Sequence, residues 1–126
     1  MLQKAMNKNT SFDFIEEHQD EMSWLTLTEV HFDNIKFIER FEHKIHWKHL
    51  ILNHNLPMDV IYKYEHKFDD ILIASQKNLD YEYILTRANK LPWLRILSRN
   101  KFNLPQIEEN LKHIKKVVEH YDRQDF

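Results

Sequence analysis

Apolar residues recur along this chain at one fixed distance. An aromatic or β-branched residue followed by isoleucine returns every 23 residues, as Phe14-Ile15, Phe37-Ile38, Val60-Ile61 and Tyr83-Ile84. The three tryptophans keep the same step, since they are separated by 23 and then by 46 residues. A constant period of about 20 to 50 residues is typical of stacked repeat proteins. The pattern therefore predicts a repeat array.

Each repeat predicts two short helices. The clearest copy has two apolar stripes at helical spacing, one made by Phe37, Ile38, Phe41 and Ile45 and the other by Trp47, Leu50 and Ile51. Isolated helices shorter than about 12–15 residues are marginal in water, so such helices must be stabilised by their neighbours. A stack of copies supplies those contacts. We expect an all-α, solenoid-like stack of short helix pairs.

The period places the boundaries of the predicted domain. Residues 1–10 are expected to be a mobile N-terminal segment, and residues 11–126 a single helical repeat domain with repeats at 11–33, 34–56, 57–79 and 80–102. Residues suited to helix N-caps open four of the segments, namely Ser11, Asn34, Asp80 and Asn103. From Asn103, apolar residues at a 3.6-residue period predict one longer capping helix over residues 103–122.

Composition supports helices and excludes several classes of site. The 126 residues include no glycine, which removes Gly-rich phosphate loops and glycine-dependent hairpin turns. The absence of cysteine removes disulfides and thiolate metal sites. No apolar run reaches the roughly 20 residues of a membrane helix. The sequence therefore predicts a soluble intracellular protein.

The motif from Phe37 to Leu50 carries a resemblance. Its form, F-I-x-x-F-x-x-K-I-x-W-x-x-L, resembles short Trp-containing helical repeats in proteins of giant DNA viruses and large phages. The repeat junctions Asn55-Leu56-Pro57 and Asn78-Leu79-Asp80 fit the same family. The resemblance covers about three quarters of the chain and implies a viral source and a helical array. It implies no activity, because these repeats have no assigned function.

Charge is distributed unevenly, and this gives the candidate partner-binding residues. Residues 11–42 carry nine acids and two bases, whereas residues 86–121 carry eight bases and three acids. The candidate set comprises the bases around Trp93, which are Arg87, Lys90, Arg95, Arg99 and Lys101, together with Asp70. Asp70 stands where a fourth tryptophan is expected. It predicts either a gap that forms a binding notch or, with Asp69, a helix cap.

Catalytic and metal sites are not predicted. His43, His46 and His49 are three residues apart, but the repeat interrupts the helix near His46, so solvated histidines are favoured over zinc or copper ligands. Acids adjacent in sequence, such as Glu16-Glu17, point about 100° apart on a helix and do not form a catalytic pair. We therefore expect no enzyme activity, no cofactor and no bound metal.

Three functions fit these expectations. The favoured one is a protein–protein interaction module, a viral or phage factor that binds a host protein in the host cytoplasm. The second is a small virion structural protein whose acidic and basic ends meet neighbouring subunits. The third is a nucleic-acid binder that uses the basic C-terminal half, since cations among aromatic rings can hold phosphates and stack bases.

Overall fold

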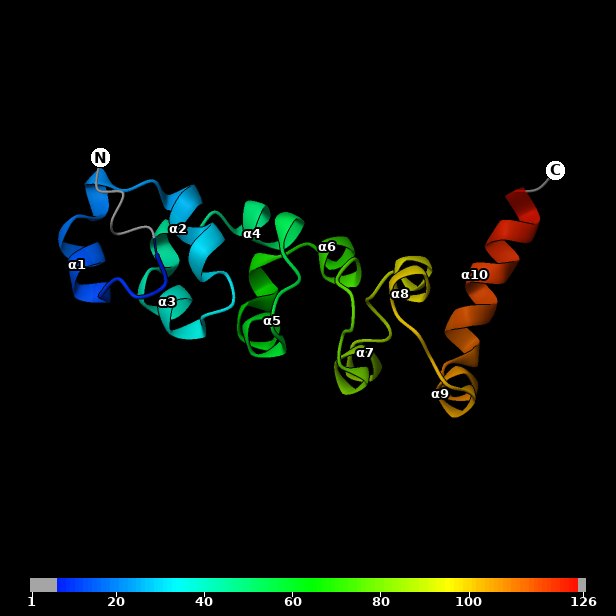
Figure 1. Cartoon of the computed structure of the whole chain (residues 1–126). Coiled ribbons are helices and arrows are strands. Elements are labelled where there is room, and N and C mark those ends of the chain that lie inside the picture. The colour runs from blue at the N-terminus through cyan, green and yellow to red at the C-terminus, as the bar shows by residue number, and fades with distance from the viewer. Residues whose placement is uncertain (1–6, 125–126) are drawn as a thin grey trace. The chain divides into compact units, whose positions relative to one another are not determined.

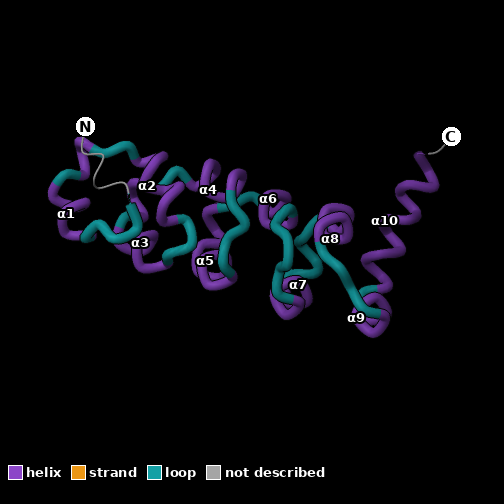
Figure 2. The backbone as a smooth tube through the Cα atoms, viewed as in Figure 1, coloured by secondary structure: helices purple, strands orange, loops and turns teal. Residues whose placement is uncertain are grey.

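The computed structural model describes residues 7–124, with side chains as far as Glu119. Its regular structure is helical throughout, and Figure 2 draws no strand in the part described, which confirms the all-α prediction. The pattern predicts one domain over 11–126, whereas the chain divides into two compact units, unit 1 up to Phe68 and unit 2 from Asp69. Of the predicted mobile segment, residues 1–6 lie outside the described residues. Thr10 N donates to Asn7 O within a turn.

Unit 1 contains five short α-helices joined by tight turns (Figure 1). They are α1 (Phe12–Glu17), α2 (Trp24–His31), α3 (Ile35–Arg40), α4 (Trp47–Asn53) and α5 (Met58–Tyr64). Short 3-10 helices follow α1, α3 and α5, at Gln19–Glu21, Glu42–Lys44 and Glu65–Lys67. The helix α2 packs against α4.

Unit 2 continues with five further helices, of which the last is the longest. They are α6 (Asp70–Ala74), α7 (Tyr81–Thr86), α8 (Trp93–Arg99), α9 (Leu104–Glu109) and α10 (Leu111–Gln124). The helix α8 packs against both α6 and α10, and α10 also contacts α9.

Helix starts follow a constant step along the chain. The helices α1, α3, α5, α7 and α9 begin at residues 12, 35, 58, 81 and 104, and α2, α4, α6 and α8 begin at 24, 47, 70 and 93, so every step is 23 residues. One residue near the end of each odd-numbered helix up to α9 has φ between −109° and −116° and ψ between 18° and 27°: His18, Phe41, Tyr64, Arg87 and Asn110. This conformation turns the chain out of each helix.

The predicted caps are partly confirmed. The side chains of Ser11 and Asn34 accept hydrogen bonds from first-turn amides of α1 and α3. Asn103 forms a full capping box, because its side chain accepts from Gln106 N while Gln106 Oε1 accepts from Asn103 N, both at 3.0 Å. Asp80 stands at the N-cap of α7 but makes no capping hydrogen bond there with its side chain.

Apolar side chains of the odd-numbered helices form the core, with one exception at the first repeat. Phe37, Val60 and Tyr83 are buried, but Phe14, at the same place in α1, is 37% exposed. Phe14 therefore departs from the burial of its counterparts, and Ile15 and Phe12 make the inward contacts of α1. First and last repeats are atypical because each has a neighbour on one side only.

The continuous helix predicted over residues 103–122 is broken at Asn110. Asn110 is buried, and its side-chain Nδ2 donates to Gln106 O at 2.8 Å and to Tyr81 Oη at 2.9 Å. A side chain that bonds a helix carbonyl in this way competes with continuation of the helix. The predicted capping helix is therefore two helices, α9 and α10, and Tyr121 near its predicted end lies outside the described side chains.

Acid should destabilise the fold through His31. This side chain is buried on α2 and stacks on Phe37 with 4.4 Å between ring centroids. Burial is the main cause that holds the pKa of His31 below its usual value of 6.5; Lys8 lowers it further, while Asp33 and a backbone hydrogen bond with Asn7 oppose the shift. The unfolded chain then takes up the proton first, so stability present above pH 6.5 is lost as pH falls below it.

The measurement is the free energy of unfolding of the wild type and of His31→Gln between about pH 7.5 and pH 5. We expect the wild type to lose stability more steeply with falling pH than the variant. His113, whose pKa is also lowered by burial, is present in both proteins and cancels in the comparison. Parallel pH profiles would show that His31 titrates normally.

Candidate interaction surface

One contact recurs between the first residue of an even-numbered helix and the residue 20 positions later. The second residue is a lysine or histidine each time, giving the pairs Trp24–Lys44 (6.0 Å from ring centroid to Nζ), Trp47–Lys67 (5.6 Å), Asp70–Lys90 (3.6 Å between Oδ1 and Nζ) and Trp93–His113 (5.0 Å between centroids). A lysine ammonium is attracted both by the face of an indole ring and by a carboxylate. The same contact therefore persists where aspartate replaces tryptophan.

This contact accounts for Asp70. The side chain is 43% exposed and forms an ion pair with Lys90 within unit 2. Asp69 occupies the N-cap position of α6, but its side chain makes no capping hydrogen bond there. The alternative that Asp69 and Asp70 cap the helix is therefore not supported. Asp70 thus takes the place of the tryptophan in the recurring contact with the residue 20 positions later.

The predicted basic residues do not form one cluster, because they have different neighbours. Arg87 lies with Cζ 4.0 Å from the centroid of the Tyr83 ring and donates to Thr86 Oγ1 at 2.7 Å. Arg95 is half-buried on α8. Arg99 and Lys101 are exposed and line a pocket that includes neither Arg87 nor Arg95. The structure therefore brings only two of the five predicted bases together.

The pocket lies in unit 2, at the chain segments that follow α6 and α8. Its volume is about 550 Å³. Three cations, three amides, two aromatic rings and two aliphatic residues line it: Lys77, Arg99, Lys101, Asn78, Asn100, Gln106, Tyr81, Phe102, Leu79 and Ile84. No acidic residue is among them. Lys77 was not predicted as a candidate, because it lies outside the basic segment 86–121 from which the candidates were taken.

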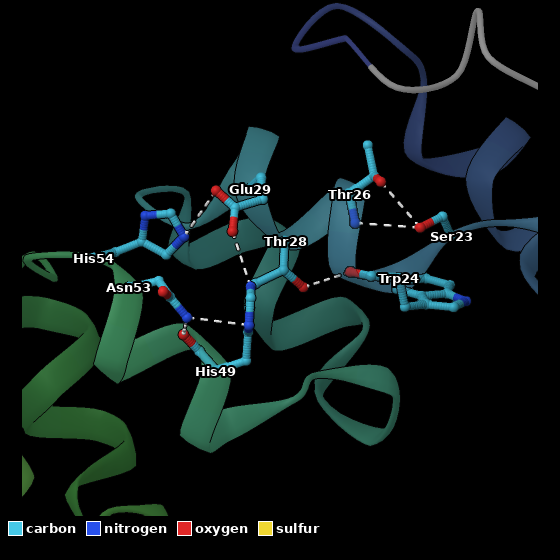
Figure 3. Close-up of polar contacts among 8 residues, drawn as sticks. All are labelled: Ser23, Trp24, Thr26, Thr28, Glu29, His49, Asn53 and His54. Carbon is cyan, nitrogen blue, oxygen red and sulfur yellow. Dashed lines mark hydrogen bonds and ion pairs between the residues drawn. The ribbon is translucent and has the colours of Figure 1, made fainter.

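A histidine–carboxylate cluster in unit 1 was also not predicted. His49 Nε2 lies 2.8 Å from Glu29 Oε1, and His54 Nε2 lies 3.4 Å from Glu29 Oε2, so two rings share one carboxylate (Figure 3). Asn53 Nδ2 lies 3.1 Å from His49 Nδ1. The hydrogen bond from His49 is the main cause that holds the pKa of Glu29 below its usual range.

The three histidines that are close in sequence do not form one site. His43 lies in a 3-10 helix with Nε2 3.4 Å from Gln19 Oε1, His46 is the N-cap of α4, and His49 belongs to the Glu29 cluster. Among the side chains described, from residue 7 to residue 119, no group of three or more histidine and acidic side chains suited to a metal ion is found. The cluster of Figure 3 acts as a cross-link between α2 and the end of α4.

Large apolar side chains are exposed near the C-terminal end of unit 2. Leu111 and Val118, seven residues apart on α10, are 42% and 52% exposed, and Leu104 and Leu94 are exposed on α9 and α8. On α10, His113 instead faces α8, where it stacks on Trp93. Residues seven apart lie on one helix face. The outer face of α10 therefore presents apolar residues, with Lys115 between them.

Comparison of the chain with protein-family models, with curated proteins and with solved structures finds no match. Within the described residues, no helix combines the length and apolar character needed to span a membrane.

Proposed function

We propose that this protein is a non-enzymatic protein–protein interaction module built as a solenoid-like array of 23-residue helix pairs. The constant step between helix starts supports the array, as does the recurring contact between residues 20 positions apart. The resemblance to viral and phage repeats extends the proposal to a factor that binds a host protein.

The observation that carries this proposal is the outer face of α10. Burying a leucine or valine side chain is worth about 1.5–3 kcal/mol, yet Leu111 and Val118 remain largely exposed. Contiguous exposed apolar residues rimmed by polar ones mark interaction sites. Lys112 and Lys115 border this face, so the partner surface is expected to be apolar with acidic residues at its edge.

The test compares two charged double variants of the full chain. Leu111→Lys with Val118→Lys should reduce capture of the specific partner from host-cell lysate by about tenfold or more, since 1.4 kcal/mol is a factor of ten. Leu25→Lys with Leu52→Lys places the same charges on exposed positions of unit 1 and should leave capture unchanged.

Quantitative mass spectrometry of the captured proteins provides the readout, and circular dichroism establishes that all three baits are folded. If no protein is enriched by the wild type, or if both variants lose it equally, the outer face of α10 is not the binding surface.

Nucleic-acid binding is a second candidate because Arg99 and Lys101 lie together beside Lys77. Phosphate contacts would make the affinity fall steeply with salt concentration. A salt-titrated binding assay with single-stranded RNA and DNA separates this candidate from the first.

A further inference from the structure

The basic pocket of unit 2 is lined by two amides at positions that correspond to two stacked aromatic rings of unit 1. In unit 1, Phe32 and His54 stack with 4.2 Å between ring centroids. Phe32 lies eight residues after the start of α2, and His54 seven after the start of α4. The same distances after α6 and α8 give Asn78 and Asn100, and both line the pocket. Two amides thus stand where two rings fill the space in unit 1.

Both asparagines hold the backbone around the pocket. Asn78 has φ of 60°, in the left-handed region that asparagine tolerates better than most residues. Asn100 Oδ1 accepts from Leu79 N at 2.9 Å, and Asn100 Nδ2 donates to Ile96 O at 3.2 Å. The pocket is therefore fixed by local hydrogen bonds, and the amide of Asn100 is already engaged.

Positive charge lines the opening, and apolar residues form the inner part. Lys77, Arg99 and Lys101 are exposed, and the described residues supply no ion-pair partner for Arg99 or Lys101. Leu79 and Ile84 are buried beneath them. The carboxylate of Glu109 accepts a hydrogen bond from Tyr81 Oη and is not part of the lining. A ligand that complements this pocket therefore carries negatively charged groups on either side of an apolar group.

We propose that this pocket binds an acidic peptide segment that carries one apolar side chain, contributed by the partner protein. Carboxylates pair with Arg99 and Lys101, and the apolar side chain packs on Leu79 and Ile84. Arginine suits carboxylates especially, because its planar fork donates two parallel hydrogen bonds. This inference rests on the proposed interaction function and names the chemistry of its partner.

A peptide fits the pocket better than a nucleic acid does. Base recognition needs free hydrogen-bonding edges and open aromatic faces. Here Tyr81 Oη is engaged by Glu109 and Asn110, and the ring of Phe102 packs against the rings of Tyr81 and Trp93, with centroids 6.1 and 6.2 Å away. The pocket instead presents positive charge and a buried apolar surface.

Fluorescence anisotropy with the full chain tests this proposal. The probe is a labelled peptide with one central leucine flanked by aspartates and glutamates; a second peptide has serine in place of leucine, and a third probe is a single-stranded oligonucleotide of equal charge. We expect the leucine peptide to bind most tightly. Arg99→Ala with Lys101→Ala should weaken its binding about tenfold or more.

Lys36→Ala with Lys48→Ala is the matched control, because it removes two exposed cations of unit 1, outside both the pocket and the outer face of α10. Equal losses in both double variants, or tighter binding of the oligonucleotide, would overturn the proposal. Failure of the peptide to bind while Leu111 and Val118 still govern partner capture would reject the pocket and leave the interaction function standing.

Discussion

Phe37→Ala is expected to lower the free energy of unfolding of unit 1 by about 3–5 kcal/mol, the usual cost of truncating a buried phenylalanine. Phe37 has no exposed surface, and four rings surround it. Their centroids lie 4.4 Å (His31), 5.0 Å (Phe41), 5.7 Å (Phe12) and 6.2 Å (Trp24) away. Removal of the ring leaves a cavity at the centre of this cluster.

Such a loss is a large fraction of the about 5–15 kcal/mol that stabilises a typical protein. Urea denaturation followed by far-UV circular dichroism measures it. The control is Phe14→Ala, at the same helix position one repeat earlier, where the exposed ring predicts a loss below about 1 kcal/mol. Equal losses of unfolding free energy in the two variants would contradict the difference in burial between Phe37 and Phe14.

Trp93→Ala should destabilise unit 2 by about 3–5 kcal/mol and release α10 from α8. Trp93 is buried, and its Nε1 donates to Ala88 O at 2.7 Å. Its ring stacks almost parallel on His113, at an angle of 6°. No other stacked ring pair within residues 7–119 joins α8 to α10. Loss of the ring therefore removes both its packing in unit 2 and the stacked contact that holds α10 against α8.

Asp70→Ala is the matched comparison, because Asp70 begins α6 as Trp93 begins α8. A surface ion pair contributes about 0–1 kcal/mol, so this variant should change stability little. Urea denaturation gives the stability of both variants, and amide hydrogen exchange of residues 111–119 reports the attachment of α10. Unchanged exchange in Trp93→Ala would show that other contacts hold α10.

The helical framework could be predicted from sequence because its signals are local. The Phe37-Ile38 pair and Trp47 place two helices, and the cap residues Ser11 and Asn34 mark where helices begin. Each of these signals acts within one or two turns of the residue that carries it.

Features that depend on distant residues could not be predicted. The hydrogen bond from Asn110 to Tyr81 joins residues 29 positions apart, and the sharing of Glu29 requires both His49 and His54. The basic pocket depends on the space beside Asn78 and Asn100, at positions where unit 1 has two stacked aromatic rings. Of the predicted bases, Arg99 and Lys101 line this pocket, whereas Arg87 contacts Tyr83 instead.

The lysines that contact the first residues of α2, α4 and α6 have a consequence for how the sequence can vary. A lysine ammonium group is attracted by either an indole face or a carboxylate. The residue that contacts Lys90 can therefore be tryptophan or aspartate, and one amino-acid substitution exchanges the two. No second, compensating substitution is needed. His113 does not give this freedom, since its half-buried imidazole stacks on Trp93 and its lowered pKa disfavours the cation that would pair with a carboxylate. The first position of α6 is thus open to substitution, and the first position of α8 is restricted.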